Sequence, residues 1–214
     1  MPNFTAVQKP PKFKRRAAAR PDEVLDAAQI LFLEKGFAAT RVDDIATLAG
    51  ISKGAVYLYF PNKQAIIEGL INRAIMPITV DMVQRLQSFT GNPKDLISMM
   101  MRSMANQLDD PKMLAIPVIV MREAPLIPQI AQLYKTKIID KLLPAFVQMI
   151  STGMDNGYLR KLDPELTVRS LMGGLAAHIL LSEFFGSQPT QGQKMSELIE
   201  NHLSIIFDGL SNHI

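Results

Sequence analysis

The segment TRVDDIATLAGISKGAVYLYFPNK, residues 40–63, decides the fold of the amino-terminal part of this chain. Its pattern predicts two short helices joined by a tight turn. Thr40 is expected to cap the first helix, and Asp43 three residues later to complete a capping box. Gly50 supplies the backbone freedom that a sharp turn needs, and Ser52 is expected to cap the second helix. This helix-turn-helix pattern is typical of proteins that read DNA.

The second predicted helix suits an approach to a DNA groove. Gly54 and Ala55 are small, so the backbone can come close to the base edges on the floor of the major groove. Lys53 can reach a guanine edge or a phosphate oxygen. The expected DNA-binding residues are Thr40, Arg41, Ser52, Lys53, Gly54, Ala55, Tyr57, Tyr59 and Lys63. Taken alone, the pattern also fits an ordinary helical hairpin with a surface lysine and two half-buried tyrosines.

The flanking segments favour the DNA-reading interpretation. Residues 21–35 predict an amphipathic helix with proline at its first position. Gly36 is expected to end that helix, with Phe37 folding back onto its last turn. Downstream, Asn62 can cap a long helix. The predicted order is therefore a supporting helix, the helix-turn-helix, and a connecting helix.

The stretch LDAAQILFLEKGFAATRVDDIATLAGISKGAVYLYFPNKQAIIEGL, residues 25–70, resembles the TetR (tetracycline-repressor) family of transcriptional regulators, of the AcrR-like kind. The resemblance rests on the GF that ends the first helix, the TRVDDIA start, the AGISKG turn and the YLYFPNK exit. Beyond about residue 75 it rests on helical pattern, length and the segment REAPLIPQIA. It implies an all-α homodimer whose heads bind a palindromic operator in double-stranded DNA. It also implies a carboxy-terminal body that binds a small molecule and then releases the DNA.

Composition bounds the class of protein. The chain has 214 residues, 48% hydrophobic and 20% charged, which is enough to bury a core. It has no cysteine, so disulfide and thiolate chemistry are excluded and a reducing compartment is compatible. The amino-terminal residues form no apolar signal region, and no stretch is long and apolar enough to predict a membrane span. A cytoplasmic bacterial protein, associated with the nucleoid when bound to DNA, is expected.

The charge is distributed unevenly along the chain. The net charge is +3, yet residues 1–20 carry six basic residues and no acid, which leaves −3 for the remainder. Such an arm can contact phosphate or the adjacent minor groove, or remain a solvated tail. We expect a flexible basic arm at residues 1–20, a DNA-binding head at residues 21–66, and a ligand-binding and dimerisation body at residues 67–214.

The body is predicted to be helical throughout. Pro77 is expected to break the connecting helix, and Pro144 to kink a long helix at residues 129–154. With the helices of the head, about nine helices and no sheet are expected.

The last two helices are the predicted dimer contact, two from each subunit forming a four-helix interface. Small residues allow close approach, and the final helix has a broad apolar face. The candidate interface residues are Gly174, Ala177, Leu181, Leu198, Ile199, His202, Leu203 and Ile206. The alternative is that these faces belong only to the core of each protomer.

Thirteen methionines suggest an adaptable ligand pocket, because unbranched thioether side chains adjust to many shapes. Each is also an ordinary core residue, and a buried histidine is often simply hydrogen-bonded. The candidate pocket residues are Met100, Met101, Met104, Met121, Phe146, Met149 and His178. The three histidines show no metal-ligand spacing, so neither a metal nor another cofactor is expected.

No catalytic motif is found. The chain lacks phosphate-cradling and dinucleotide glycine patterns, a G-x-S-x-G motif, and H-E-x-x-H. The predicted function is therefore a ligand-responsive DNA-binding regulator, a homodimeric repressor released by a small, largely apolar effector, and not an enzyme. Two alternatives remain: a dimeric DNA-binding regulator without a ligand, and a helical enzyme with an unfamiliar site. A body packed without a cavity would favour the first of these.

Overall fold

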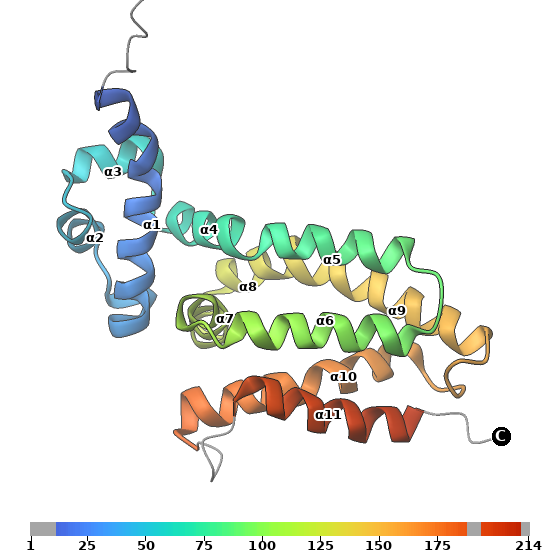
Figure 1. Ribbon diagram of the computed structural model, residues 1–214. Helices are drawn as coiled ribbons and strands as arrows, with labels where there is room; N and C mark the ends of the chain where they lie inside the picture. Colours follow the sequence, from blue (N-terminus) through green and yellow to red (C-terminus); the bar gives the residue numbers. More distant parts are fainter. Residues whose placement is uncertain (1–11, 188–193, 211–214) are drawn as a thin grey trace, which may run out of the picture. The chain divides into compact units, whose positions relative to one another are not determined.

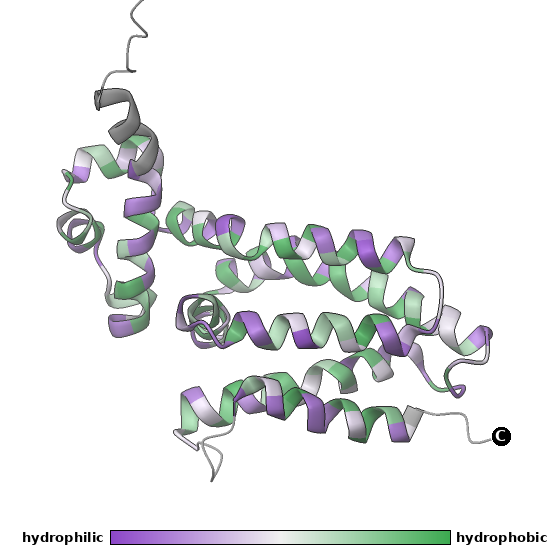
Figure 2. Ribbon diagram, in the orientation of Figure 1, coloured by the Kyte–Doolittle hydropathy of each residue, from purple (hydrophilic) through white to green (hydrophobic). Residues whose placement is uncertain are grey.

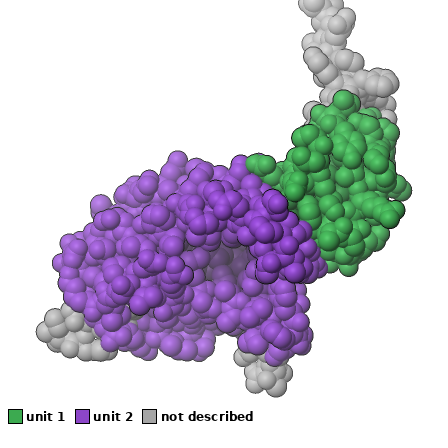
Figure 3. Space-filling model, turned by 180° about the vertical axis from the view of Figure 1, so that it is seen from behind, with its two compact units in different colours: residues 1–70 green, residues 71–214 purple. Residues whose placement is uncertain are grey.

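The computed structural model describes residues 12–187 and 194–210, which contain helices and no strand (Figure 1). The predicted all-α class is confirmed for this part of the chain. It forms two compact units, residues 1–70 and 71–214 (Figure 3). Unit 1 contains α1 (Lys12–Ala39), α2 (Val42–Leu48), α3 (Lys53–Tyr59) and most of α4 (Lys63–Ala74). Unit 2 contains α5 (Met76–Ser88), α6 (Pro93–Leu108), α7 (Pro111–Glu123), α8 (Pro128–Tyr134), η1 (Lys135–Ile139), α9 (Asp140–Asp155), α10 (Pro164–Ile179), η2 (Leu180–Phe184) and α11 (Met195–Leu210).

The first helix begins earlier than predicted. It starts at Lys12 and takes Pro21 into its interior, whereas the sequence places the start at Pro21. The alanines and basic residues before the proline are strong helix formers, which favours continuation across one missing hydrogen bond. Residues 12–20 of the predicted flexible arm are therefore helical, and residues 1–11 lie outside the described residues. The predicted end is confirmed, because Gly36 has a φ of 83°.

The corner between α1 and α2 differs from the predicted cap by one residue. Arg41, not Thr40, is the N-cap of α2, and its N–H donates to the Asp44 carboxylate at 3.4 Å. Thr40 is only 1% exposed, and its hydroxyl donates to the main-chain oxygens of Leu31 and Gly36 at 3.2 and 2.7 Å. The threonine hydroxyl thus holds the end of α1 instead of the start of α2.

The turn between α2 and α3 follows the prediction. Gly50 has a φ of 67°, a conformation that side chains other than glycine rarely adopt. The N–H of Ile51 donates to the oxygen of Ala46 at 3.0 Å, which closes the turn. Ser52 caps α3, because its hydroxyl oxygen accepts from the N–H of Ala55 at 3.2 Å.

Lys63, the first residue of α4, closes the head from the other side. Its ammonium donates to the main-chain oxygens of Phe37, Ala38 and Thr40 at 2.5, 3.1 and 2.9 Å. It also lies 4.5 Å from the centre of the Phe37 ring, a cation–π contact. Phe37 and Ala38 are in the last turn of α1 and Thr40 follows it, so the ammonium lies at the carboxyl end of this helix, where the helix dipole favours a positive charge. One side chain thus ties α4 to the corner between α1 and α2.

The packing of α4 on α1 explains where unit 1 ends. A Cβ on Gly69 would lie 2.8 Å from the Phe60 ring and 2.9 Å from a Leu25 methyl, so only glycine permits this approach. Ile67 and Leu70 are each 1% exposed. The sequence places the head–body boundary between residues 66 and 67, whereas the compact units divide after Leu70. The last turns of the head are held by this close contact.

Unit 2 is a stack of helices with apolar residues on their facing sides (Figure 2). The connecting helix is broken at Ile75, so α4 and α5 are separate and Pro77 lies in the first turn of α5, as predicted. α5 packs on α9, α9 on α10, and α6 on α11. The fully buried side chains of this unit include Ile97, Ile116, Ile119, Ile130, Ile150, Leu159 and Ile199.

The predicted helix at residues 129–154 is interrupted upstream of Pro144, not at it. A π turn, η1, spans Lys135–Ile139 and separates α8 from α9. Pro144 lies inside α9 and has no N–H for the carbonyl of Asp140, the residue that follows the π turn. Lys135 and Asp140, five residues apart, form an ion pair with Nζ–Oδ1 2.7 Å across the wider turn.

Replacing Lys63 with methionine should loosen unit 1, because the apolar stem remains while three carbonyl oxygens lose a charged donor. We expect the free energy of opening the head to fall by about 1.5–3 kcal/mol, the contribution of a hydrogen bond to a charged group. Hydrogen–deuterium exchange of peptides from α1 and α4 measures it. Lys53→Met is the control, since the Lys53 ammonium bonds the exposed Asp43 carboxylate instead of main-chain oxygens. Equal exchange in both variants would show that the Lys63 contacts add nothing.

Candidate DNA-binding face, cavity and subunit face

The structure brings five of the nine predicted DNA-binding residues, Thr40, Arg41, Lys53, Tyr57 and Lys63, to one concavity of the head. A concavity of about 430 Å³ is lined by Ala38, Thr40, Arg41, Val42, Asp43, Lys53, Tyr57, Pro61, Asn62 and Lys63. Arg41, Ser52, Lys53 and Gly54 are exposed, and Tyr57 is 44% exposed. Gly54 has open space where a side chain would stand, its nearest neighbour lying 4.0 Å away. Ala55 and Tyr59 are half-buried and do not line the concavity.

Lys53 is already paired. Its ammonium lies 2.8 Å from an Asp43 carboxylate oxygen, and both side chains are about half exposed. The hydrogen bond that Lys53 donates to Asp43, followed by the negative charge of Asp43, raises the pKa of Lys53. The pair spans from the first turn of α2 to the first residue of α3. Asp43 therefore holds the predicted reading lysine in place, a role that the sequence analysis did not assign to it.

Two residues that were predicted to contact DNA, Thr40 and Lys63, direct their polar groups to main-chain oxygens of the head. The hydroxyl of Thr40 is buried and bonded to main-chain oxygens, so its assignment as a DNA contact is corrected to a positioning role. Lys63 directs its ammonium to the three carbonyls of the α1–α2 corner, so in this structure it supports the face. The sequence cannot separate these roles, because carbonyl and phosphate oxygens are both acceptors for lysine.

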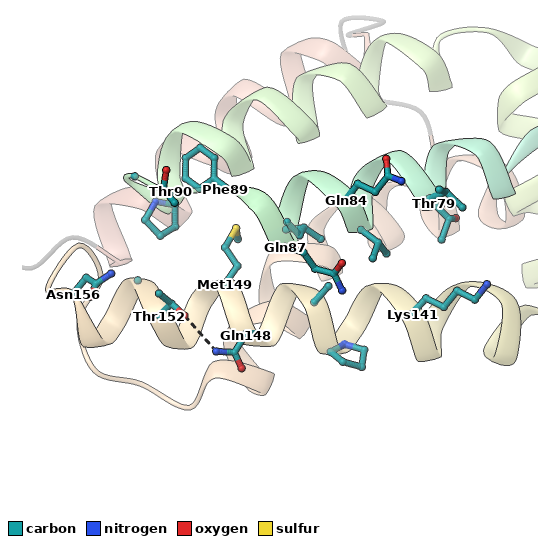
Figure 4. Close-up of a pocket in the computed structure, with 18 of the residues that line it drawn as sticks. Thr79, Gln84, Gln87, Phe89, Thr90, Lys141, Gln148, Met149, Thr152 and Asn156 are labelled. Atoms are coloured by element: carbon teal, nitrogen blue, oxygen red, sulfur yellow. Dashed lines mark hydrogen bonds between the residues drawn. The ribbon is translucent and has the colours of Figure 1, made fainter.

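Unit 2 contains a cavity of about 860 Å³ between α5 and α9 (Figure 4). One wall comes from α5 and the loop after it, the other from α9 and the segment that follows. The lining combines apolar residues, such as Val80, Val83, Leu86 and Met149, with uncharged polar ones, such as Gln84, Gln87, Gln148 and Thr152. The volume of the cavity between α5 and α9 is within the usual range of small-molecule sites, about 300–1,000 Å³.

The predicted pocket residues are divided by the structure. Met149 lines the cavity between α5 and α9. Met100 and Met104 line a second, smaller cavity of about 170 Å³ between α5 and α6. The remaining candidates, Met101, Met121, Phe146 and His178, line neither cavity. Several of the predicted methionines thus fill space between helices, whereas the lining of the larger cavity is richer in glutamine and threonine.

An apolar face remains uncovered on α10 and η2. Leu166, Gly173, Ala177, Leu181 and Phe184 follow one another at intervals of seven, four, four and three residues, which places them on one side of the helix. Leu166 is 62% exposed and Leu181 50%. On the adjoining α11, Ile205 is 63% exposed and borders a groove of about 320 Å³ together with Leu166. Large exposed apolar side chains in this number are typical of a protein interface.

Several predicted interface residues belong to the protomer's own core. Ile199 and Leu203 are 0% and 3% exposed on α11, which packs on α6. The Nε2–H of His202 donates to the Leu171 oxygen at 2.9 Å, and its ring lies where a Cβ on Gly174 would stand, 2.5 Å away. Glycine at 174 thus admits His202 within one protomer. Ala177 and Leu181 are exposed as the interface requires, and Leu198 and Ile206 are half-buried.

Two further observations limit what the chain can bind. Among the described residues, no group of three or more histidines and carboxylates is placed to hold a metal ion. In the same part of the chain, every helix is too short or too polar to cross a membrane.

Comparison with known proteins gives two family matches. Residues 24–70 match the bacterial regulatory proteins of the tetR family, and residues 96–208 match the carboxy-terminal domain of AefR-like transcriptional repressors. The repressor BepR of Brucella suis is 33% identical over 84 residues, which is 39% of this chain and 40% of BepR. The chain thus matches less than half the length of this curated relative.

Solved structures extend the likeness of fold to almost the whole chain. SmeT, the repressor of a multidrug efflux pump in Stenotrophomonas maltophilia, has a TM-score of 0.74 and 19% identity, covering 92% of this chain and 93% of SmeT. FadR of Bacillus subtilis, solved with stearoyl-CoA, has a TM-score of 0.72 and 20% identity, covering 88% and 98%. The second family match spans more than half of the chain, and the first falls on the helix-turn-helix head. The chain therefore belongs to the TetR family of bacterial regulatory proteins.

Proposed function

We propose that this protein is a homodimeric DNA-binding repressor released from a palindromic operator by a small effector. The observation that carries the proposal is the face of α2 and α3, where Arg41, Lys53, Gly54 and Tyr57 are exposed together. A short helix with a small residue at its second position can enter a major groove, and cationic and hydroxyl groups beside it suit base edges and phosphates. Acting on chromosomal DNA places the protein in the bacterial cytoplasm.

A dimer supplies the second head. The uncovered apolar face of α10 and η2, with Ile205 of α11, would pair with the same face of a second copy about a twofold axis. Two heads held in this way read half-sites about one DNA turn apart, near 34–36 Å, so the operator is an inverted repeat. A dimer bound to a promoter represses by occupying it.

The cavity between α5 and α9 is the proposed effector site. α5 follows α4 directly in the chain, so a ligand that moves α5 acts on the helix that enters the head. A coupling of about 1–3 kcal/mol is enough to weaken operator binding, and operator DNA must weaken ligand binding by the same factor. The structural relative FadR was solved with stearoyl-CoA, and SmeT is the repressor of a multidrug efflux pump. Both support a site for a largely apolar molecule.

The alternatives have less support. A regulator without a ligand is expected to pack its body tightly, whereas unit 2 contains a cavity of about 860 Å³. The matched relatives are transcriptional regulators, which gives no support to an enzyme. Selection of bound fragments from genomic DNA would identify the operator and thereby test the proposal directly. If specific sites are not enriched, the proposal fails.

With the selected operator, affinity should fall steeply as salt rises. Neutralising roughly 6–10 phosphates per dimer gives a log–log slope of about −5 to −9. Ala55→Glu should abolish binding at every salt concentration, because a carboxylate on α3 would face acceptor-rich base edges and phosphates. Fluorescence anisotropy with labelled duplex measures both effects. A nearly flat salt dependence, or an Ala55→Glu variant that binds normally, would contradict the proposed face.

Asp43→Asn should make binding stronger and less selective. Removing the carboxylate leaves the Lys53 ammonium uncompensated in each head, so the slope of the dimer should steepen by roughly two. Lys53→Ala should instead relax the preference at one base position, by about tenfold or more. Asp81→Asn, which breaks an exposed ion pair to Arg85 in unit 2, is the matched control. An unchanged slope in Asp43→Asn would show that the aspartate does not restrain Lys53.

A substitution in the uncovered apolar face of α10 and η2 should dissociate the proposed dimer. Leu181→Glu should produce monomers, because it places an unpaired charge in an apolar interface, and operator affinity should fall with it. Leu126→Glu is the control, since Leu126 is 75% exposed but lies between α7 and α8. Light scattering gives the mass, and circular dichroism shows that the fold is kept. A folded Leu181→Glu dimer would remove this face from the interface.

A further inference from the structure

The cavity between α5 and α9 is elongated. Its lining runs from Thr79 to Thr90 on the α5 side and from Asp140 to Asn156 on the α9 side. At 1.5 Å per residue, the α9 side is about 24 Å long. In Figure 4, Thr79 and Lys141 lie toward one end, and Thr90 and Asn156 toward the other. A volume of about 860 Å³ spread over this length suits an extended molecule better than a compact one.

The middle of the cavity is lined by apolar side chains and by polar side chains that carry no charge. Val83, Ala145 and Met149 line it from the two helices. Gln87 and Gln148 accompany them, and the Gln148 amide lies 3.4 Å from the Thr152 hydroxyl. An alkyl chain would find van der Waals partners along this middle section, while the amides and hydroxyls remain able to bond one another or water.

The two ends of the cavity differ in charge. Asp140 and Lys141 are the charged residues of the lining, and both are at the same end. Both oxygens of Asp140 accept from the Lys135 ammonium, at 2.7 and 2.9 Å, so the aspartate charge is balanced. Among the residues that the structure describes, Lys141 has no carboxylate partner. This end therefore has one uncompensated positive charge, whereas Thr90, Asn156 and Tyr158 at the other end are uncharged polar residues.

We propose that the cavity binds an extended carboxylate amphiphile, a carboxylic acid with an unbranched alkyl chain. Its carboxylate lies at Lys141 and its chain runs between α5 and α9 toward Asn156. The charge complementarity at one end, the apolar middle and the length carry the proposal together. That this molecule is also the effector rests on the proposed function, but its binding does not.

The test uses three molecules that differ only in the head group: decanoate, 1-decanol and decyltrimethylammonium. Isothermal titration of the full-length protein without DNA gives each affinity. Decanoate is expected to bind most tightly and decyltrimethylammonium least. Lys141→Glu should reverse the order of the two charged molecules, changing their affinity ratio by about tenfold or more, because an exposed ion pair contributes up to about fivefold and its repulsive counterpart a similar factor. Lys112→Glu, an exposed lysine of α7 outside the lining, should leave the ratio unchanged.

A second variant tests where the alkyl chain of the bound molecule lies. Ala145→Phe places a ring in the middle of the cavity and should weaken all three molecules at least tenfold, with helicity and thermal midpoint kept. The proposal is overturned if none of the three molecules binds, if decyltrimethylammonium binds the unaltered protein as tightly as decanoate, or if Lys141→Glu leaves the order unchanged. Equal binding by Ala145→Phe overturns the placement of the chain. Decanoate that binds but does not release operator DNA would refute its role as effector while leaving the site intact.

Discussion

The ammonium group of Lys63 is the contact on which the geometry of the head depends. It joins the first residue of α4 to three carbonyls at the carboxyl end of α1, and Thr40 joins the same corner to the body of α1. The corner sets where α2 begins, and the turn at Gly50 then sets where α3 points. Because backbone oxygens are strong and obligatory acceptors, this arrangement leaves the corner little freedom to move separately from α4. Any displacement of α4 would therefore reach the reading helix.

The sequence predicted the local structure of the head well, because that structure rests on short-range chemistry. The cap at Ser52, the left-handed turn at Gly50 and the helix end at Gly36 each depend on residues within a few positions. Thr40 was expected to cap α2, but its hydroxyl bonds the main-chain oxygens of Gly36 and Leu31, four and nine residues before it. Side-chain choice between two equally suitable acceptors is a tertiary property that a linear pattern does not contain.

The sequence indicates the packing of unit 2 less directly, for a related reason. Helical periodicity shows that α11 has a broad apolar face, but not that α6 covers the part containing Ile199 and Leu203. A cavity depends on which two helices fail to fill the space between them. The available signal was a row of uncharged polar residues on α5, such as Thr79, Gln84 and Gln87, with Asp81 and Arg85 on the other side. Methionine abundance hid that signal because thioether side chains fill gaps as readily as they line them.

The π turn before α9 has a consequence for the evolution of the cavity. An α-helix turns by about 100° per residue, so one residue added to or removed from η1 would rotate every later side chain of α9 by that angle. Such a change would turn Met149 away from the cavity, and the other side chains of α9 that line the cavity would turn away with it. A single-codon insertion or deletion at this turn would therefore change which side chains of α9 face the cavity without substituting any of them.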